Sequence, residues 1–169
     1  MPSTTTSAQP FDADVAIVGF GPVRQALAAL LGHAGHRVVA FERFDEIYRL
    51  PRAVHVDHEI MRMLHKLQVT DGLADDFVPF RDYHWFGADG EPLMTLQAPV
   101  PAASGWEPDY LFFQPILEHA LDARARSAST VTVERGWAAT GLTTDDDGAE
   151  LVVSRVADPA DTRTVRARW

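Results

Sequence analysis

The sequence predicts an α/β fold of the Rossmann-like type, in which a parallel βαβ unit is followed by an antiparallel β-meander. A buried strand, a glycine-rich turn, a helix and a second buried strand fit into about thirty residues, the size of one right-handed βαβ unit. Further strand patterns follow one another after residue 130. The 169 residues, 46% of them hydrophobic and 23% charged, suit one globular domain.

The βαβ unit is predicted from three consecutive patterns. Residues 14–18 and 37–42 are short apolar runs rich in β-branched residues, which are typical of strands buried on both faces of a parallel sheet. The Ala- and Leu-rich segment 22–34 between them predicts a helix. Pro22 suits its first turn and Gly35 suits its exit.

Two more helices are predicted. The first has Asp57 as its N-cap and runs to about Leu67. The second begins at Pro115 and runs to about Arg126. The inward residues expected from helical spacing are Ile60, Met63, Leu64 and Leu67 in the first, and Ile116, Leu117, Ala120 and Leu121 in the second.

The remaining strands follow from alternation and turn signals. The segments with strand character are 81–86, 92–96, 110–113, 131–135, 138–143 and 150–156. A turn over 88–91 makes the first two a hairpin, and Asp145–Gly148 is a turn between the last two. Segments 48–56 and 98–108 are expected to be loops. Alternation at Val165, Ala167 and Trp169 predicts that the chain stops inside a strand. The domain prediction is a disordered tail over 1–12 and a single domain over 13–169.

Composition narrows the class of partner. With 24 acidic and 15 basic residues, the net charge is −9, which argues against nucleic-acid binding because that needs a concentrated positive surface. No cysteine is present, so disulfides and thiolate sites are excluded. No signal peptide and no apolar run of the ~20 residues needed to cross a bilayer is seen. We expect a cytoplasmic protein without a membrane partner.

The glycine-rich turn carries the main functional signal. Gly19 permits a tight turn after the first strand, and Gly21 allows a pyrophosphate to approach the backbone closely. Pro22 and Val23 open the helix, whose free N–H groups and positive dipole end favour an anion. Glu42 ends the second strand, 23 residues after Gly19, where a carboxylate accepts hydrogen bonds from the adenosine ribose. These residues together predict a dinucleotide site.

One position departs from the G-x-G-x-x-G fingerprint of dinucleotide-binding turns, which begins here at Gly19. Its third glycine, which allows close packing of helix on strand, is replaced by Arg24. The arginine must point outward or push the helix away, and it could reach a phosphate. Both alternatives remain open from the sequence. Of these, displacement of the helix by the arginine is favoured. Replacing Arg24 with glycine is therefore expected to tighten cofactor binding.

The chain resembles the FAD-dependent aromatic hydroxylases, the class A flavoprotein monooxygenases typified by p-hydroxybenzoate hydroxylase. The resemblance begins with Val15–Val23 and Val39–Arg43. Phe44–Glu59, Tyr83–Phe86 and Gly90–Met94 narrow it to the branch that includes 3-(3-hydroxyphenyl)propionate hydroxylase. The block from Leu50 to Glu59 is the most specific part, and the resemblance covers nearly the whole chain after the tail.

The resemblance implies FAD as the cofactor, NADH or NADPH as the electron donor and a small phenolic acid as the substrate. It implies that Glu42 binds the ribose and that Arg43 lies near the adenine. Arg52 would approach the flavin or its pyrophosphate, and Gln114 would also contact FAD. The strands after Val131 would form the meander that covers the adenine. Catalytic residues are not predicted.

Members of this group continue for several hundred residues, with further flavin-contacting motifs and the sheet that forms the substrate pocket. The fold is therefore expected to be incomplete at its C-terminus. Self-association or a complementing C-terminal part is expected, and whether this chain alone is active is left open. A non-catalytic FAD- or nucleotide-binding remnant is the alternative function. A plain NAD-dependent dehydrogenase is a weaker third possibility, because such an enzyme would continue its βα units where the meander is predicted.

Other candidate sites are weaker. His55 and His58 have a spacing compatible with a metal, but no cluster completes a coordination shell, so no metal site is predicted. The aspartates at 145–147 fit a solvated turn better than a calcium loop. The aromatic run Tyr83–Phe86 is interpreted as core rather than as substrate wall. Ser104 lacks the strand-to-helix elbow of a hydrolase nucleophile.

Overall fold

The computed structural model describes residues 11–97 and 102–169. The chain divides into two compact units, which are described separately. The first comprises the described residues up to Glu46 together with Ala125–Trp169, and the second comprises Ile47–Arg124. Most of the predicted N-terminal tail, residues 1–10, and residues 98–101 of the predicted loop lie outside the described residues.

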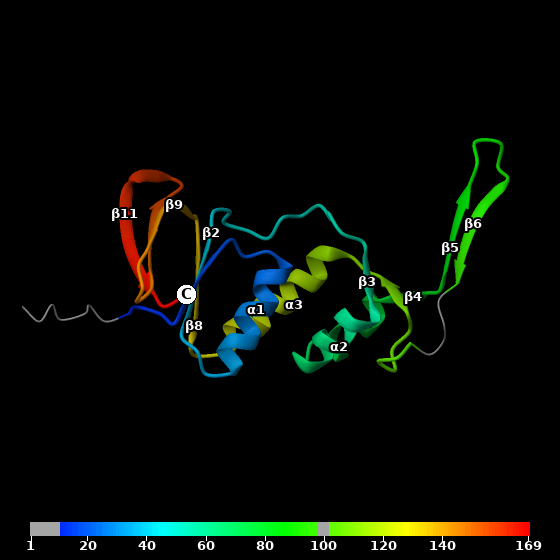
Figure 1. Cartoon of the computed structure of the whole chain (residues 1–169), viewed down its shortest axis with the longest axis horizontal. Helices are drawn as coiled ribbons and strands as arrows, with labels where there is room; N and C mark the ends of the chain where they lie inside the picture. The colour runs from blue at the N-terminus through cyan, green and yellow to red at the C-terminus, as the bar shows by residue number, and fades with distance from the viewer. Residues whose placement is uncertain (1–10, 98–101) are drawn as a thin grey trace, which may run out of the picture. The chain divides into compact units, whose positions relative to one another are not determined.

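The first unit contains the predicted βαβ unit. Strand β1 (Val15–Val18), helix α1 (Pro22–His33) and strand β2 (Val38–Glu42) follow in order. A third strand, β8 (Val131–Arg135), completes a parallel sheet of order β1-β2-β8. Figure 1 shows α1 on one side of this sheet. The predicted strand–turn–helix–strand is therefore confirmed, with bounds that differ by one residue.

Small residues let α1 lie close to the sheet. Ala28 and Ala29 of α1 are fully buried, as is Ala40 of β2. Near the end of α1, a Cβ added at Gly32 would lie within 2.9 Å of Ala128 Cβ and even nearer to Val131 Cγ2. Because no side chain fits there, Gly32 sets the approach of the helix to β8.

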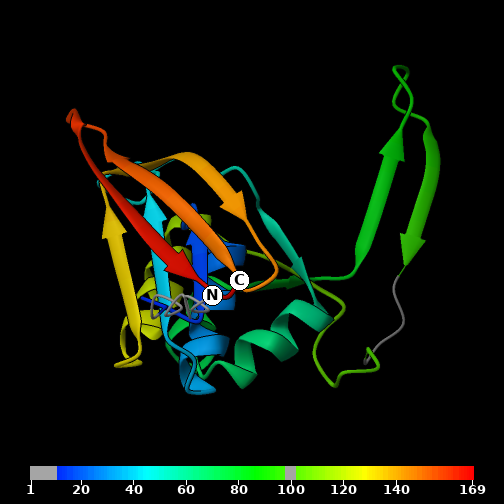
Figure 2. The same ribbon diagram turned by 60° about the vertical axis from the view of Figure 1, so that its left-hand side comes forward.

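The other face of the sheet is covered by a three-stranded antiparallel meander (Figure 2). It consists of β9 (Trp137–Thr144), β10 (Ala149–Arg155) and β11 (Asp158–Ala167), in the order β11-β10-β9. The side chains that form the core beneath it are Phe41, Trp137, Leu151, Val153 and Val165. The meander is confirmed, although β11 begins well before the alternation that predicted it.

The C-terminal residue Trp169 is hydrogen-bonded to the backbone of β1 and of the residue before it. The Ala16 N–H donates to Trp169 O at 2.8 Å, and the Trp169 N–H donates to Asp14 O at 3.1 Å. At the other end, the Asp12 N–H donates to Arg166 O at 2.9 Å. The N-terminal residues nearest β1 are therefore held against β11.

The second unit is built around two small sheets. Strands β3 (His55–Asp57), β7 (Asp109–Leu111) and β4 (Val78–Phe80) form an antiparallel sheet in that order. Strands β5 (Asp82–Phe86) and β6 (Pro92–Gln97) form the predicted hairpin. The helical elements are α2 (His58–Lys66), the 3-10 helix η1 (Asp71–Asp76) and α3 (Gln114–Arg126), whose last residues belong to the first unit.

The cap of α2 is as predicted, because the Asp57 carboxylate accepts the N–H groups of Glu59 and Ile60. The predicted stripe is partly wrong. Leu64 and Leu67 are buried as predicted, but Ile60 is exposed and Met61 is buried in its place, because Met61 also lies at helical spacing from Leu64. In α3, Leu117 and Leu121 are buried as predicted, but Ile116 is exposed.

The interpretation of Tyr83–Phe86 as core is also wrong. Trp85 is 41% exposed and Phe86 is 61% exposed, because β5 pairs with β6 in a two-stranded sheet that leaves both its faces accessible. Strand β3 begins within the expected loop over 48–56, and η1 and β4 lie in a segment for which no element was predicted. Among the described residues, no helix is long and apolar enough to cross a membrane.

Candidate functional site: a glycine turn held by an acidic residue

The turn after β1 has the geometry that a phosphate site needs. Gly19 has φ +86°, a conformation that side chains disfavour, and its N–H donates to Phe41 O at 2.7 Å. Gly21 is the N-cap of α1, and a Cβ added there would meet no atom within 4 Å. Pro22 is the first helical residue, and Val23 is 80% exposed. The start of α1 is therefore open to an approaching anion.

The structure brings Glu42 to this turn. Its Oε2 accepts the Phe20 N–H at 2.7 Å, and its Oε1 accepts the Phe44 N–H at 3.0 Å. The carboxylate at the end of β2 is thus oriented by two backbone amides, one of them from within the glycine turn. Sequence reasoning placed Glu42 at the strand end but missed both partners, which no spacing rule reveals.

The turn is also braced from the helix side. The buried Gln25 donates from Nε2 to Phe20 O at 3.0 Å. Arg24, its neighbour, is exposed, and its guanidinium lies over Gly19, with Nη1 3.3 Å from the position of a Cβ added there. The side chain therefore points outward and does not separate α1 from the sheet. Of the two alternatives left by the sequence, the structure shows the outward one.

Two further arginines lie near this turn. Arg43 is exposed and its guanidinium carbon lies 4.7 Å from the centre of the Phe44 ring. Arg135 is paired with Glu42 in the register of β2 and β8, and its guanidinium carbon lies 5.8 Å from the centre of the Phe20 ring. Sequence reasoning missed Arg135. The available signal was its position at the end of a strand beside the strand that ends in Glu42.

The second unit brings Arg52 and Gln114 together. Gln114 is buried, and its Oε1 accepts the N–H groups of Arg52 at 2.7 Å and Ala53 at 2.8 Å. Its Nε2 donates to the buried Glu118 at 2.5 Å. The Arg52 guanidinium lies against the Tyr48 ring, 5.1 Å from its centre. Gln114 therefore fixes the backbone of the Arg52 loop, whichever ligand that loop contacts.

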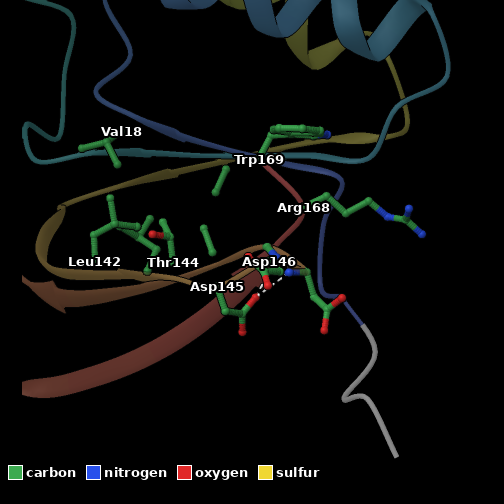
Figure 3. Close-up of a pocket in the computed structure, with 12 residues that line it drawn as sticks. Val18, Leu142, Thr144, Asp145, Asp146, Arg168 and Trp169 are labelled. Atoms are coloured by element: carbon green, nitrogen blue, oxygen red, sulfur yellow. Dashed lines mark hydrogen bonds between the residues drawn. The ribbon is translucent and has the colours of Figure 1, made fainter.

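A separate pocket of about 540 Å³ lies between β1 and the meander. Figure 3 shows Val18, Leu142 and Trp169 among the side chains that line it. It shares no residue with the predicted cofactor site. The Asp145 carboxylate at its rim accepts the N–H groups of Asp147 and Gly148, which lower the pKa of Asp145. These aspartates form a hydrogen-bonded turn.

The two histidines considered for a metal have different partners. His55 contacts Asp109, and His58 contacts the Ser104 hydroxyl at 3.1 Å. Within residues 11–97 and 102–169, no group of three or more His, Asp or Glu side chains is arranged to hold a metal ion.

A positive-φ glycine turn, an open helix start and an acid held at the next strand end define a dinucleotide-binding α/β unit. Comparison with known families identifies which one. Residues 12–169 match the family described as FAD binding domain, and the chain belongs to that family.

Named relatives agree with this assignment, and a solved structure shares the fold. The chain is 38% identical over 156 residues to a "Probable NADH-specific resorcinol 4-hydroxylase" of Rhodococcus jostii, covering 92% of this chain and 29% of the relative. It is 31% identical to a 3-(3-hydroxy-phenyl)propionate/3-hydroxycinnamic acid hydroxylase of Comamonas testosteroni, covering 94% and 26%. The fold matches p-nitrophenol 4-monooxygenase of Pseudomonas putida with a TM-score of 0.83 at 24% identity, covering 95% of this chain and 40% of that one. The chain thus spans less than a third of the length of the two named relatives.

Proposed function

We propose that this chain is the FAD-binding part of a monooxygenase that hydroxylates a phenolic compound with NADH or NADPH and O2. The observation that carries the proposal is the Glu42 carboxylate held against the Gly19–Gly21 turn by the Phe20 amide. A carboxylate beside an open helix start suits a ribose acceptor next to a phosphate site in one unit. The antiparallel meander after β8 favours this proposal over a plain dehydrogenase, which would continue with βα units.

The residues present fit an adenine dinucleotide. The open space at Gly21 and the exposed start of α1 suit a pyrophosphate. A carboxylate has about four acceptor sites, so Glu42 can accept ribose hydroxyls in addition to its two backbone donors. We propose that Arg43 lies beside the adenine and that Arg52, positioned by Gln114, contacts the flavin portion. When bound, FAD supplies the redox chemistry, and the protein supplies position and exclusion of water.

The substrate class follows from what the relatives' names share. Resorcinol, 3-(3-hydroxyphenyl)propionate and 3-hydroxycinnamic acid each carry a phenolic hydroxyl, so we propose a phenol as the substrate. One relative is named as NADH-specific, which makes NADH the first donor to test. A complementing C-terminal part and self-association remain proposals, supported by the exposed apolar side chains of the β5–β6 hairpin. The cytoplasmic location stays a prediction.

The decisive experiment measures binding of FAD, ADP and 2′,3′-dideoxy-ADP to the chain and to Glu42→Gln. Loss of a hydrogen bond to a charged acceptor costs about 1.5–3 kcal/mol, so Glu42→Gln is expected to weaken ADP binding by roughly tenfold or more. The chain should discriminate against the dideoxy ligand, and Glu42→Gln should not.

The control variant is Glu150→Gln, which removes the same charge from an exposed position on β10. It should bind all three ligands like the unmodified chain. Failure of the chain to bind FAD or ADP at millimolar concentration refutes the proposal. Equal discrimination by Glu42→Gln and the unmodified chain removes Glu42 from the ribose site.

A further inference from the structure

Three titratable side chains meet in the second unit, on strands that are distant in the sequence. His55 lies on β3, Asp109 on β7 and Tyr83 on β5. His55 Nε2 is 2.5 Å from Asp109 Oδ1, and the Tyr83 hydroxyl is 3.1 Å from the same nitrogen. The cofactor residues proposed above do not include any of the three.

This geometry determines which ring nitrogen of the neutral imidazole carries the hydrogen. An ionised carboxylate only accepts, so the contact with Asp109 requires that Nε2 carries the hydrogen. Burial, and then the nearby Asp109 charge, raise the pKa of Tyr83, so its hydroxyl keeps its proton and can donate to the same carboxylate. The neutral imidazole then has its lone pair on Nδ1. Among the described residues no hydrogen bond engages Nδ1, and the His55 side chain is 41% exposed.

Apolar side chains lie beside this ring. In the sheet, His55 is paired with Leu111, and Leu111 is paired with Val78, so the three share one face. Leu111 and Val78 are both exposed. Trp85, also partly exposed, stacks on Tyr83 with ring centres 5.9 Å apart. An available base is therefore bordered by apolar surface that an aromatic ring can cover.

Each strand beside His55 contributes a group near its imidazole ring. Strand β7 contributes Asp109, and β5 contributes Tyr83. Strand β4 contributes the uncharged Phe80, whose ring meets His55 edge-on at 5.5 Å. Asp57, two residues along β3, caps α2. A single carboxylate, that of Asp109, thus contacts the imidazole.

We propose that His55, oriented by Asp109, is the base that takes the proton from the phenolic hydroxyl of the substrate. The phenol O–H bond breaks, its electron pair stays on oxygen, and an N–H bond forms at Nδ1. The products are a phenolate and an imidazolium whose other N–H remains bound to Asp109. The phenolate ring is richer in electrons than the phenol ring and is the better acceptor of an oxygen atom. The inference rests on the proposed function for the class of substrate.

The test uses the 169-residue chain with 4-nitrophenol, a phenol whose ionised form absorbs visible light. Below the pKa of the free probe, adding the chain should produce the phenolate band. His55→Gln should abolish the band, and Asp109→Asn should weaken it severalfold, because the imidazole loses the carboxylate that orients it. The matched control is His84→Gln on the β5–β6 hairpin, next to Tyr83; the imidazole ring of His84 contacts Thr95. It should leave the band unchanged.

A second readout separates a base from a residue that only holds the hairpin to the sheet. Imidazole nitrogen NMR should show His55 protonated at Nε2 alone, and titration with the phenol should protonate Nδ1. Tyr83→Phe should retain the phenolate band, because the base is still present. No band with the unmodified chain overturns the inference. So does a band that persists in folded His55→Gln, or one that disappears in folded Tyr83→Phe.

ADP binding is measured on the same samples, because its site is in the other unit. ADP binding without a phenolate band overturns the role of His55 and leaves the proposed function standing. A phenolate band without ADP or FAD binding refutes the cofactor proposal and supports the base.

Discussion

Replacing Arg24 with glycine restores the third position of the glycine fingerprint and removes the guanidinium that lies over Gly19. The sequence alone favoured tighter cofactor binding, on the assumption that arginine separates the helix from the strand. In the structure Arg24 is exposed, while Ala28 and Ala29 are fully buried. No steric strain is present for the substitution to relieve. We therefore expect the opposite sign, namely weaker binding.

The expected loss of binding free energy follows from the position of the Arg24 guanidinium. Its Nη1 lies 3.3 Å from the Cβ position of Gly19, at the start of α1 where the pyrophosphate is proposed to bind. A hydrogen bond to a charged group contributes about 1.5–3 kcal/mol when shielded, but exposed ion pairs contribute only about 0.2–1 kcal/mol. For an exposed arginine we expect about 1 kcal/mol, or about fivefold in Kd.

The assay compares ADP and adenosine binding to the chain, Arg24→Gly and Arg24→Gln at low and high salt. Glutamine retains much of the size and removes the charge, and it avoids the cost of about 1 kcal/mol that glycine adds in a helix. Both variants should weaken ADP binding alike, less so at high salt, and should leave adenosine binding unchanged. Tighter binding by Arg24→Gly alone would restore the steric explanation. Unchanged binding by both would show that Arg24 does not contact the phosphates.

Three further predictions concern stability. Gly32→Ala should cost about 1–3 kcal/mol in denaturant unfolding because it overpacks the helix–sheet contact, whereas Gly72→Ala, whose added Cβ meets nothing within 4 Å, should cost much less. Asp57→Ala should cost about 1 kcal/mol by removing the α2 cap, and an unchanged midpoint would contradict that role. Hydrogen bonds from the Arg37 N–H and guanidinium lower the pKa of Asp14 below 3.8, so its contribution is present above that pH and lost as pH falls through the lowered value. The stability difference between the chain and Asp14→Asn should therefore shrink below about pH 4, and a difference constant with pH would refute it.

The parts predicted from the sequence are those that local pattern determines. Strand β1, helix α1 and strand β2 were predicted to within one residue because burial, glycine and proline signals are all short-range. The Asp57 cap was predicted for the same reason. Strands of three residues such as β3 and β4 carry too little periodicity to be distinguished from loop.

The sequence predicted where the candidate site residues lie along the chain, but not which atoms they contact. Glu42 was placed at the correct strand end, yet its bond to the Phe20 amide depends on a side-chain rotamer that spacing does not determine. Gln114 was predicted to contact the cofactor, and the structure shows its oxygen bound to the backbone of the Arg52 loop, 62 residues earlier in the chain. The contact between His55 and Asp109 spans 54 residues and has no sequence signal.

The tolerance of arginine at the third fingerprint position has a physical explanation in the direction of each side chain. The buried residues of α1 are Gln25, Ala26, Ala28, Ala29 and Gly32, which together form one face of the helix. Arg24 lies just outside this face, about 40° around the helix from Ala28 and about 100° from Gln25, and its side chain is exposed. Close approach is therefore provided by the small residues that follow, while Gln25 connects the helix to the turn through Phe20 O. What the fold requires is a narrow helix face toward the sheet, and a long side chain is acceptable wherever the helix directs it to solvent. A bulky residue at position 28 or 29, unlike one at 24, should therefore displace α1 and open the turn that Glu42 holds.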